Sequence, residues 1–298
     1  MKVTLWGTRG SLASPGAETA RYGGNTSCVE VQANGAVLVL DAGTGIRRLG
    51  ATLAEKFTRV DLLLTHLHMD HIQGLGFFAP LYDPEVSVHI WGPASATLDL
   101  RARLMRYLSP PLFPVHLRDL PCNLVLHEVP RGEFEIGPFR IRSGPVCHPG
   151  PTVGYRIETE HAVLCYLPDH EPALGSSVFP GHGDWTSGYA AAKDADLLIH
   201  DAQYTSAEYA EHIGWGHSSM QQAFAFAKLA GVKHFVPFHH DPAHSDDDLD
   251  RLISSAAAVA APSFQVTPGT EGTSFNLTNS GTPSSAQAAK GVRGRLRA

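Results

Sequence analysis

The 298-residue sequence predicts an α/β fold built as a four-layer αββα sandwich, with two facing sheets and helices on their outer faces. Three observations carry this prediction. Short apolar runs recur in two sets, helical patterns lie between them, and metal-competent residues directly follow several of the runs. The composition also allows a sizeable core, because 43% of the residues are hydrophobic and 17% are charged.

The expected strands fall into an early set and a late set. The early set comprises Val3–Trp6, Cys28–Val31, Val37–Leu40, Val60–Leu64 and Val86–Trp91. The late set comprises Leu124–Leu126, Phe139–Ile141, Val153–Ile157, Val163–Tyr166, Leu197–Ile199 and Phe235–Phe238. Short apolar runs of this kind are typical of buried strands, and their order supports one pair of facing sheets.

Helical patterns occur between and after these strands. They are expected at Ser95–Leu108, Thr205–His212, Ser219–Ala230 and Asp246–Ala260. Two helix starts carry a capping signature: Ser218 with Gln221, and, in a weaker form, Ser245 with Asp248. The proline-rich stretch 109–121 cannot be regular structure, so it is either a rigid connector or a wall over a site.

Residues 1–278 are expected to form a single domain, and the Ser-, Ala-, Gly- and Arg-rich stretch 279–298 a disordered tail. The chain contains no apolar run of about eighteen residues, which argues against a membrane span. Its first residues lack a signal-peptide hydrophobic region, so a cytoplasmic location is expected. The four cysteines lack paired close spacing and are expected to be small buried residues, neither disulfides nor thiolate ligands.

Charge is distributed unevenly along the chain. The formal net charge is −6, but Lys290, Arg293, Arg295 and Arg297 all lie in the tail. The remaining body carries −10 without them. An acidic body attracts polyanions poorly, so long nucleic acid is disfavoured as a partner.

The segment Thr65–His71 concentrates His66, His68, Asp70 and His71 directly after an apolar run. Alternate side chains of an extended backbone point the same way, so the first three can converge at a strand end, whereas His71 needs a turn. Imidazole nitrogens and carboxylate oxygens together suit zinc, iron or manganese. The alternative, a chance histidine-rich surface loop, does not account for the position at a strand end.

Further metal-competent residues follow later apolar runs. His148 comes after 143–147, Asp169 after 162–168, and His239 after 235–238. One such residue alone is more often a hydrogen-bonded core or turn residue, but several in order favour a metal site. His239 and His240 compete for one ligand position, and the other could support the ligand from behind.

With these residues the chain resembles the metallo-β-lactamase superfamily, specifically its ribonuclease Z and phosphodiesterase-like branch, from about Val3 to Leu277. The resemblance implies a metallo-β-lactamase fold and a hydrolase with two divalent ions, zinc or else manganese or iron. It implies that the first ion is held by His66, His68 and His148, the second by Asp70, His71 and His239, and that Asp169 bridges them.

The resemblance also implies catalytic roles around a hydroxide that bridges the metals. Asp70 would orient or deprotonate the attacking water, and Asp201 would orient His217. His217 would then act as a general acid or contact the phosphate. The family more often has Glu at the position of Asp201. The alternative assigns His217 to a polar helix entry and Asp201 to a turn.

Weaker motifs lie elsewhere in the chain. Arg9, in a glycine-rich segment, could contact a phosphate, although a tight turn explains this segment equally well. Asp41 is expected to steady a metal-binding histidine from behind. Phe77, Phe78 and Phe113 could stack on a base, but aromatic residues in such positions more often pack in the core.

The leading hypothesis is a phosphodiesterase that acts on a small nucleotide, a cyclic phosphate or an RNA end. A second hypothesis keeps the fold but assigns lactone, thioester or lactam hydrolysis. A third is a nucleotide-sensing protein with a retained metal site. The expected partners are a small phosphodiester substrate and a second copy of the chain, since relatives are often dimers.

Overall fold

The structure, a computed structural model, describes residues 1–53, 56–176 and 178–278, so the predicted tail 279–298 lies outside the described residues. One sheet contains β1 (Lys2–Gly7), β2 (Cys28–Ala33), β3 (Ala36–Leu40), β4 (Arg59–Leu63), β5 (Ser87–Gly92), β6 (Asn123–Glu128) and β14 (Ser274–Asn276). The other contains β7 (Gly132–Ile136), β8 (Phe139–Pro145), β9 (Val153–Thr159), β10 (Ala162–Leu167), β11 (Leu197–Asp201), β12 (His234–Phe238) and β13 (Gln265–Val266). The helices are α1 (Ile46–Leu53), α2 (Met69–Ile72), α3 (Leu100–Leu104), α4 (Tyr189–Ala192), α5 (Ser206–Glu211), α6 (Met220–Ala230) and α7 (Asp246–Ala260).

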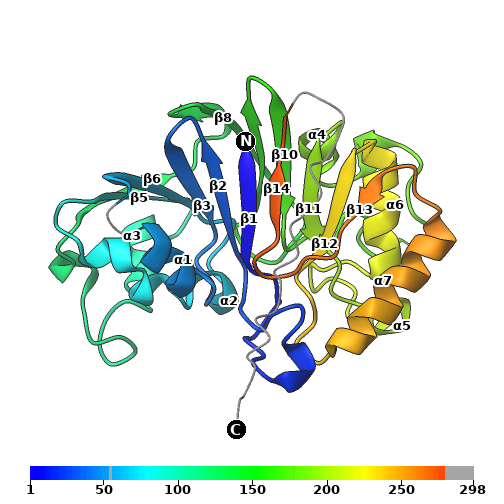
Figure 1. Ribbon diagram of the computed structural model, residues 1–298, viewed down its shortest axis with the longest axis horizontal. Coiled ribbons are helices and arrows are strands. Elements are labelled where there is room, and N and C mark those ends of the chain that lie inside the picture. The colour runs from blue at the N-terminus through cyan, green and yellow to red at the C-terminus, as the bar shows by residue number, and fades with distance from the viewer. Residues whose placement is uncertain (54–55, 177, 279–298) are drawn as a thin grey trace, which may run out of the picture.

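The two sheets are mixed and have related layouts. The strand order is β14-β1-β2-β3-β4-β5-β6 in the first sheet and β13-β12-β11-β10-β9-β8-β7 in the second. In the first sheet, each pair of neighbours from β3 to β6 is parallel, and the pairs β1–β2 and β2–β3 are antiparallel. In the second sheet, each pair of neighbours from β10 to β13 is parallel, and each pair from β7 to β10 is antiparallel. Figure 1 shows the two sheets splayed around the centre of the molecule, with α1 and α3 outside one and α6 and α7 outside the other.

Three layers of buried apolar side chains hold the sandwich together. The middle layer joins the inner faces of the sheets, for example through Leu5 and Leu38 against Ile157 and Leu164. A second layer packs α1 and α3 on the first sheet, and a third packs α6 and α7 on the second. Burial of apolar surface on both faces of each sheet is what an αββα arrangement requires. The predicted four-layer sandwich is therefore confirmed.

Helix boundaries differ from the expectation in two places. The helix expected at 95–108 is reduced to α3, because Asp99 caps its start by accepting the N–H of Ala102. The cap of α6 is Ser219 with Gln222, one residue after the expected pair. The capping box of Ser245 and Asp248 at the start of α7 is confirmed.

Strand assignments also needed correction at the sheet edges. β6 comes first in the late set along the chain, but it pairs with β5 in the first sheet. β7, β13 and β14 were not expected. β7 alternates charged and apolar residues, and β13 has only 2 residues, so neither shows the apolar run that marks a buried strand.

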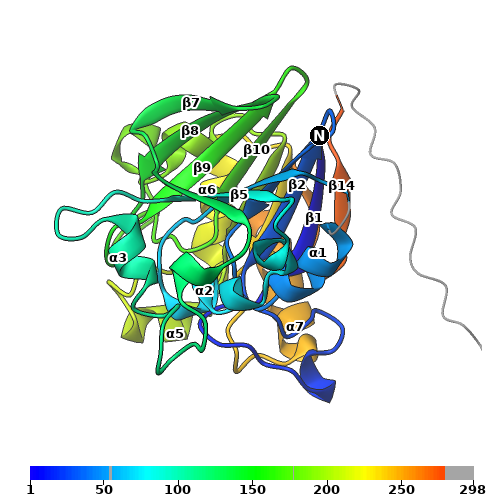
Figure 2. The same cartoon turned by 90° about the vertical axis from the view of Figure 1, so that its left-hand side faces the viewer.

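The carboxyl ends of β4, β10, β11 and β12 lie at one edge of the sandwich, the lower edge in Figure 1. In Figure 2 the same edge carries α2 and α5. The chain segments that follow these strand ends hold most of the metal-competent residues predicted from the sequence. Strand direction therefore brings distant parts of the chain to one place.

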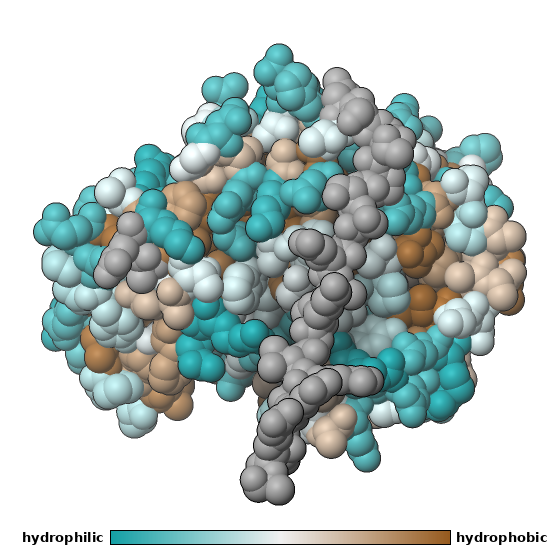
Figure 3. Space-filling model, viewed as in Figure 1, coloured by the Kyte–Doolittle hydropathy of each residue, from teal (hydrophilic) through white to brown (hydrophobic). Residues whose placement is uncertain are grey.

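The surface is mixed in character. On the face shown in Figure 3, hydrophilic residues alternate with apolar ones over both halves of the sandwich. Within the part of the chain that the structure describes, every helix is too short or too polar to cross a membrane. The four cysteines are unpaired. Cys28, Cys122 and Cys165 are buried as expected, whereas Cys147 is only partly buried.

A buried hydrogen bond across the sandwich supports the edge that carries the metal-competent residues. Tyr155, fully buried on β9, donates its hydroxyl to the carbonyl of Leu64, 2.7 Å away, just before Thr65 and His66. We expect Tyr155→Phe to lower the free energy of unfolding by about 1–3 kcal/mol, because the Leu64 carbonyl oxygen is left buried without this partner. Urea denaturation of the metal-free protein measures the change.

Tyr82→Phe is the matched control for this variant. The Tyr82 hydroxyl also donates to a carbonyl oxygen at 2.7 Å, that of Gly76, but Tyr82 is 42% exposed. Water can replace the lost donor there, so the expected cost is at most about 0.5 kcal/mol. Equal costs for the two variants would contradict the proposed bridging role of Tyr155.

Candidate metal centre

All seven ligands predicted from the sequence lie together at the strand-end edge. Their ligand atoms form two groups, each with every pair of atoms within 4.8 Å: His66, His68 and His148 in the first group, and Asp70, His71, Asp169 and His239 in the second. His148 Nε2 lies 3.1 Å from His68 Nδ1. The members come from segments that follow β4, β8, β10 and β12, so both sheets contribute to both groups.

Asp169 belongs to the second group and also faces the first. Its Oδ1 is 2.9 Å from His71 Nε2 and 3.3 Å from His239 Nε2, in the second group. Its Oδ2 is 3.7 Å from His66 Nε2 and 3.8 Å from His148 Nε2, in the first group. One carboxylate oxygen therefore faces each group, which is the arrangement that a bridging ligand needs.

Four of the histidines have one ring nitrogen bonded on the side away from the cluster. The Nδ1 contacts are His66 with Thr65 Oγ1 at 3.1 Å, His71 with Asp41 Oδ2 at 2.9 Å, His148 with the Gly216 carbonyl at 2.9 Å, and His239 with Gln203 Oε1 at 3.0 Å. When Nδ1 donates to an oxygen, a neutral ring presents the lone pair of Nε2 to the cluster. This is the usual arrangement of metal-binding histidines.

Asp41 organises the back of the cluster, as predicted. Besides His71, its buried carboxylate accepts the N–H and the hydroxyl of Thr65 and the hydroxyl of Tyr166. Thr65 in turn contacts His66 Nδ1. A single carboxylate thus orients one histidine of each group.

The first group consists of neutral imidazoles. Burial lowers the pKa of His66 well below its usual value, and burial also lowers the pKa of His68 and of His148. Neutral imidazole is the form that binds a metal. His66 Nε2 is buried and has no hydrogen-bond partner among the described residues, which fits a nitrogen reserved for a cation.

The second group favours positive charge. Burial opposes ionisation of Asp169, but the charges of His239 and His71 outweigh it and hold the pKa of Asp169 well below its usual range. Burial also opposes charge on His71, but Asp169, Asp70 and Asp41 outweigh it and raise the pKa of His71 well above its usual value. The donor set, imidazole nitrogens with carboxylate oxygens, therefore fits divalent zinc, manganese or iron.

The choice between His239 and His240 follows from the geometry. His239 Nε2 lies 3.1 Å from Asp70 Oδ2, inside the second group. His240 faces away and contacts the carbonyl oxygen of Gly269 through Nε2 at 2.8 Å. Gly10 leaves the space that the His239 ring occupies, since a Cβ at Gly10 would lie 2.3 Å from His239 Nδ1.

Asp201 and His217 form a pair beside the two groups. His217 Nδ1 lies 2.6 Å from Asp201 Oδ2, so the short aspartate does reach the histidine. The His217 ring stacks on His239 with centroids 5.0 Å apart and meets His148 edge-on at 5.1 Å. Burial lowers the pKa of His217, but the charge and hydrogen bond of Asp201 outweigh it and raise the pKa to about 9. A protonated imidazole at this place can donate a proton.

Arg9 does not serve the site as a phosphate contact. Its fully buried guanidinium donates to the carbonyl oxygens of Gly23, Asp241 and His244. Arg9 therefore serves the fold, and its backbone pairs with Thr26 and His240 where a tight turn was the alternative. The segment does contribute through Ser11, whose N–H donates to Asp70 Oδ2 at 2.8 Å.

The aromatic candidates for base stacking mainly pack in the protein. Phe78 and Phe113 are buried, and Phe77, 58% exposed, meets Phe113 edge-on. Two contributing residues had no predicted role: Gln203, which contacts His239, and Glu171, which holds a loop next to His148. Their position beside Asp201 and Asp169 in the sequence was the only signal.

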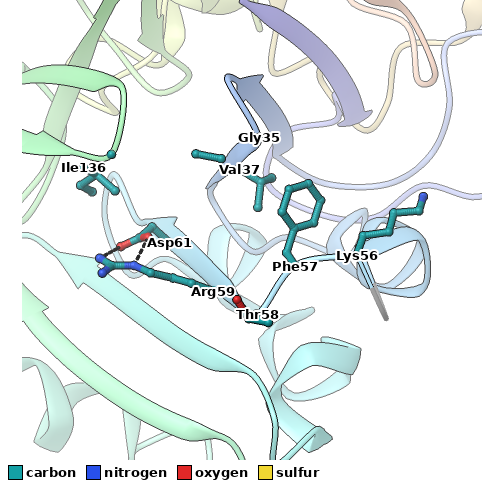
Figure 4. Close-up of a pocket in the computed structure, with 10 residues that line it drawn as sticks. Gly35, Val37, Lys56, Phe57, Thr58, Arg59, Asp61 and Ile136 are labelled. Atoms are coloured by element: carbon teal, nitrogen blue, oxygen red, sulfur yellow. Dashed lines mark hydrogen bonds and ion pairs between the residues drawn. The ribbon is translucent and has the colours of Figure 1, made fainter.

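A separate cavity of about 280 Å³ lies away from these groups. Figure 4 shows Phe57, Val37 and Ile136 around it, together with Arg59. Arg59 makes two hydrogen bonds of 2.8 and 2.9 Å to Asp61, so its charge is already paired within the protein. None of the predicted ligands lines this cavity. This cavity is therefore not part of the candidate metal centre.

Known proteins share this sequence pattern and fold. A profile of the β-lactamase superfamily domain matches residues 37–240. The ribonuclease Z of Gemmatimonas aurantiaca is 28% identical over 287 residues, which cover 82% of this chain and 89% of that protein. The ribonuclease Z of Haloarcula marismortui is 25% identical over 297 residues, with 86% and 91% covered.

Solved structures agree on the fold. The metallo-β-lactamase fold protein YhfI of Bacillus subtilis superimposes with a TM-score of 0.67 at 22% identity, with 92% of this chain and 97% of that chain covered. The short form of human tRNase Z gives 0.65 at 23% identity, with 93% and 99% covered. The chain belongs to the β-lactamase superfamily, has the metallo-β-lactamase fold, and resembles the ribonuclease Z and phosphodiesterase-like branch that its motifs indicated.

Proposed function

We propose that the chain is a metal-dependent hydrolase that cleaves a phosphodiester of a small nucleotide, a cyclic phosphate or an RNA end. The observation that carries the proposal is the Asp201–His217 pair beside the two ligand groups. A thiolate leaves a thioester without a proton, whereas the alkoxide that leaves an unactivated phosphodiester needs one, so a fixed proton donor favours phosphodiester over thioester hydrolysis. The ribonuclease Z relatives are consistent with this chemistry.

The proposed first ion is held by His66, His68 and His148, the proposed second ion by Asp70, His71 and His239, and Asp169 is the bridge. When bound, two divalent ions supply hydroxide near neutral pH and neutralise charge on the phosphodiester. We propose zinc, with manganese and iron as alternatives, because the same nitrogen and oxygen ligands accept all three.

Asp70 is the proposed base or orienting group for the attacking water. Burial raises its pKa, but the charge of His71 and hydrogen bonds from His239 and His71 outweigh burial and lower the pKa below its usual range. Ser11 also donates its N–H to this carboxylate at 2.8 Å. Asp70 is therefore ionised and held in position within the second group, where it can accept a hydrogen bond from water.

His217 is the proposed general acid. Asp201 accepts the Nδ1–H of His217 and stabilises the imidazolium form, which leaves the Nε2–H to be donated to the leaving oxygen or to a phosphate oxygen. Asp201 is itself held by the N–H groups of Ser218 and Gln203 at 3.0 and 3.1 Å. The pair therefore offers a proton from a fixed direction.

Several properties of the whole chain are part of the proposal. We propose one domain over residues 1–278, supported by the pairing of β1 with β14 near the two ends of that range. We propose a cytoplasmic location, supported by four unpaired cysteines.

The net charge of −6 disfavours long nucleic acid as a substrate. A homodimer is the proposed assembly, and light scattering tests it.

A substrate panel tests the proposed function directly. Protein reloaded with zinc or manganese should hydrolyse bis(p-nitrophenyl) phosphate and at least one cyclic nucleotide or RNA 3′ end, and a chelator should abolish the rates. Cleavage of lactones or thioesters without phosphodiester cleavage would instead support the second hypothesis. Tight nucleotide binding without turnover would support the sensing hypothesis.

Asp169→Asn tests the bridging role. Loss of one charged oxygen should reduce the bound metal from two ions to one or fewer and lower phosphodiester hydrolysis by at least about 100-fold. Elemental analysis and initial rates measure both effects. Asp184→Asn, a change at an exposed carboxylate, is the control and should behave like the native protein. Native metal content and activity in Asp169→Asn would exclude Asp169 as the bridge.

His217→Ala tests the proton donor through the leaving group. The kcat should fall by about 100- to 10,000-fold for an alkyl leaving group, and much less for p-nitrophenolate, which leaves without a proton. His182→Ala, at an exposed histidine, is the control. An equal loss for both leaving groups would contradict a general-acid role.

Asp201→Asn tests the same pair through pH. Because the charge of Asp201 raises the pKa of His217, its removal should lower that pKa. An acid is active while protonated, so the kcat falls as pH rises through its pKa, and this descending limb should move to lower pH in the variant. A pH–rate profile with an alkyl phosphodiester measures the shift. An unchanged descending limb would contradict the assignment.

A further inference from the structure

Glu171 is a fully buried acidic residue two positions after Asp169. Its Oε1 accepts the hydroxyl of Tyr209 at 2.7 Å, and its Oε2 accepts the N–H groups of Gly214 and Gly216, both at 3.1 Å. None of these hydrogen-bond partners is a cation. Burial of a carboxylate is unfavourable unless its oxygens accept hydrogen bonds, so these two backbone amides and one hydroxyl are what stabilise it.

The segment between Gly214 and His217 is thereby fastened at two amides by one side chain. Gly216 has φ of 85°, a conformation that favours glycine. A Cβ at this position would also lie 2.4 Å from His148 Nδ1. The close approach of the Gly216 backbone to His148 therefore requires glycine, and the N–H of the same residue is bonded to Glu171.

Two groups of the candidate site depend on this segment. The carbonyl oxygen of Gly216 accepts the Nδ1–H of His148 at 2.9 Å, which leaves the lone pair of Nε2 for the first ligand group. The next residue is His217, whose ring meets that of His148 edge-on at 5.1 Å. The backbone N–H of Glu171 also donates to the carbonyl of Cys147, the residue before His148, at 2.9 Å. Glu171 thus holds both the segment of His148 and the segment of its carbonyl partner.

We propose that Glu171 is a positioning residue, which aligns His148 for the first metal ion and His217 for proton donation by fastening the segment Gly214–His217. It acts through the Gly216 carbonyl and the backbone of His217 without touching the substrate or an ion. This inference rests on the proposed function, in which His148 is a ligand and His217 is the acid.

The test compares Glu171→Ala and Glu171→Gln with Tyr209→Phe in the full chain. Zinc titration of the metal-free protein against a competing chelator should show that Glu171→Ala weakens one of the two binding steps by about 10- to 100-fold and spares the other. Glu171→Gln keeps one carbonyl acceptor, so it should give a smaller loss. Tyr209→Phe removes the third partner but leaves both glycine amides bonded to Glu171, so both steps should remain native.

A double-mutant cycle assigns the affected step. If Glu171 acts through His148, then Glu171→Ala should cost no further zinc affinity in a His148→Ala background. In steady-state kinetics with an alkyl phosphodiester, Glu171→Ala should lower the kcat while changing the KM less than about 3-fold, because the misplaced groups act on the reacting bonds.

Three results would overturn the inference. One is native zinc affinity and native kcat in Glu171→Ala, with only a lower thermal midpoint. Another is general loosening of the fold, seen as equal weakening of both zinc-binding steps or as losses in Tyr209→Phe equal to those in Glu171→Ala. A third is an additive cycle with His148→Ala. Failure of the proposed function looks different, since the native protein would then bind two ions without cleaving any phosphodiester, or would bind none.

Discussion

The buried carboxylate of Asp41 is the constraint on which the arrangement of the site depends. It lies just after β3 of the first sheet and accepts the hydroxyl of Tyr166 from β10 of the second. It also accepts the N–H of Thr65, where the chain leaves β4, and contacts the ring of His71. One side chain therefore joins both sheets, the start of the histidine-rich segment and one candidate ligand. A neutral side chain could not accept all of these donors, so the local geometry depends on a charge.

The site brings together two carboxylates that repel each other, and the positive charge of His71 offsets part of this repulsion. Asp70 and Asp169 are both buried, and their side chains share the space around His71 and His239. Such a cluster lowers the stability of the folded chain unless positive charge offsets it. The apolar layers on both sides of each sheet supply most of the apolar burial of the molecule. The sandwich is thus a support for a dense cluster of charged and titratable groups at one edge.

Much of this cluster could be predicted from the sequence, because its candidate ligands follow apolar strands. His66, Asp169 and His239 each come after such a run, and strand direction then places them at one edge. Edge strands were harder, since two of the five residues of β7 are charged and β13 is very short. The cap of α6 was misplaced by one residue because adjacent serines offer the same local signal, and only the path of the chain selects Ser219.

Other features depend on contacts that no local pattern encodes. Arg9 lies in a segment that suits phosphate binding, yet its charge is used on carbonyl oxygens of segments more than two hundred residues away. The role of Glu171 depends on a segment that begins 43 residues later. Contacts between residues so far apart in the chain cannot be inferred from spacing or periodicity.

Each ligand group draws on both sheets, and this has a consequence for the chain as a whole. A bound ion would cross-link two halves that are otherwise joined mainly by apolar packing. Unlike a disulfide, it would stabilise the chain by binding to the folded state alone, and the surroundings can withdraw it. Metal supply would then govern not only turnover but also how long each molecule survives proteolysis in the cell.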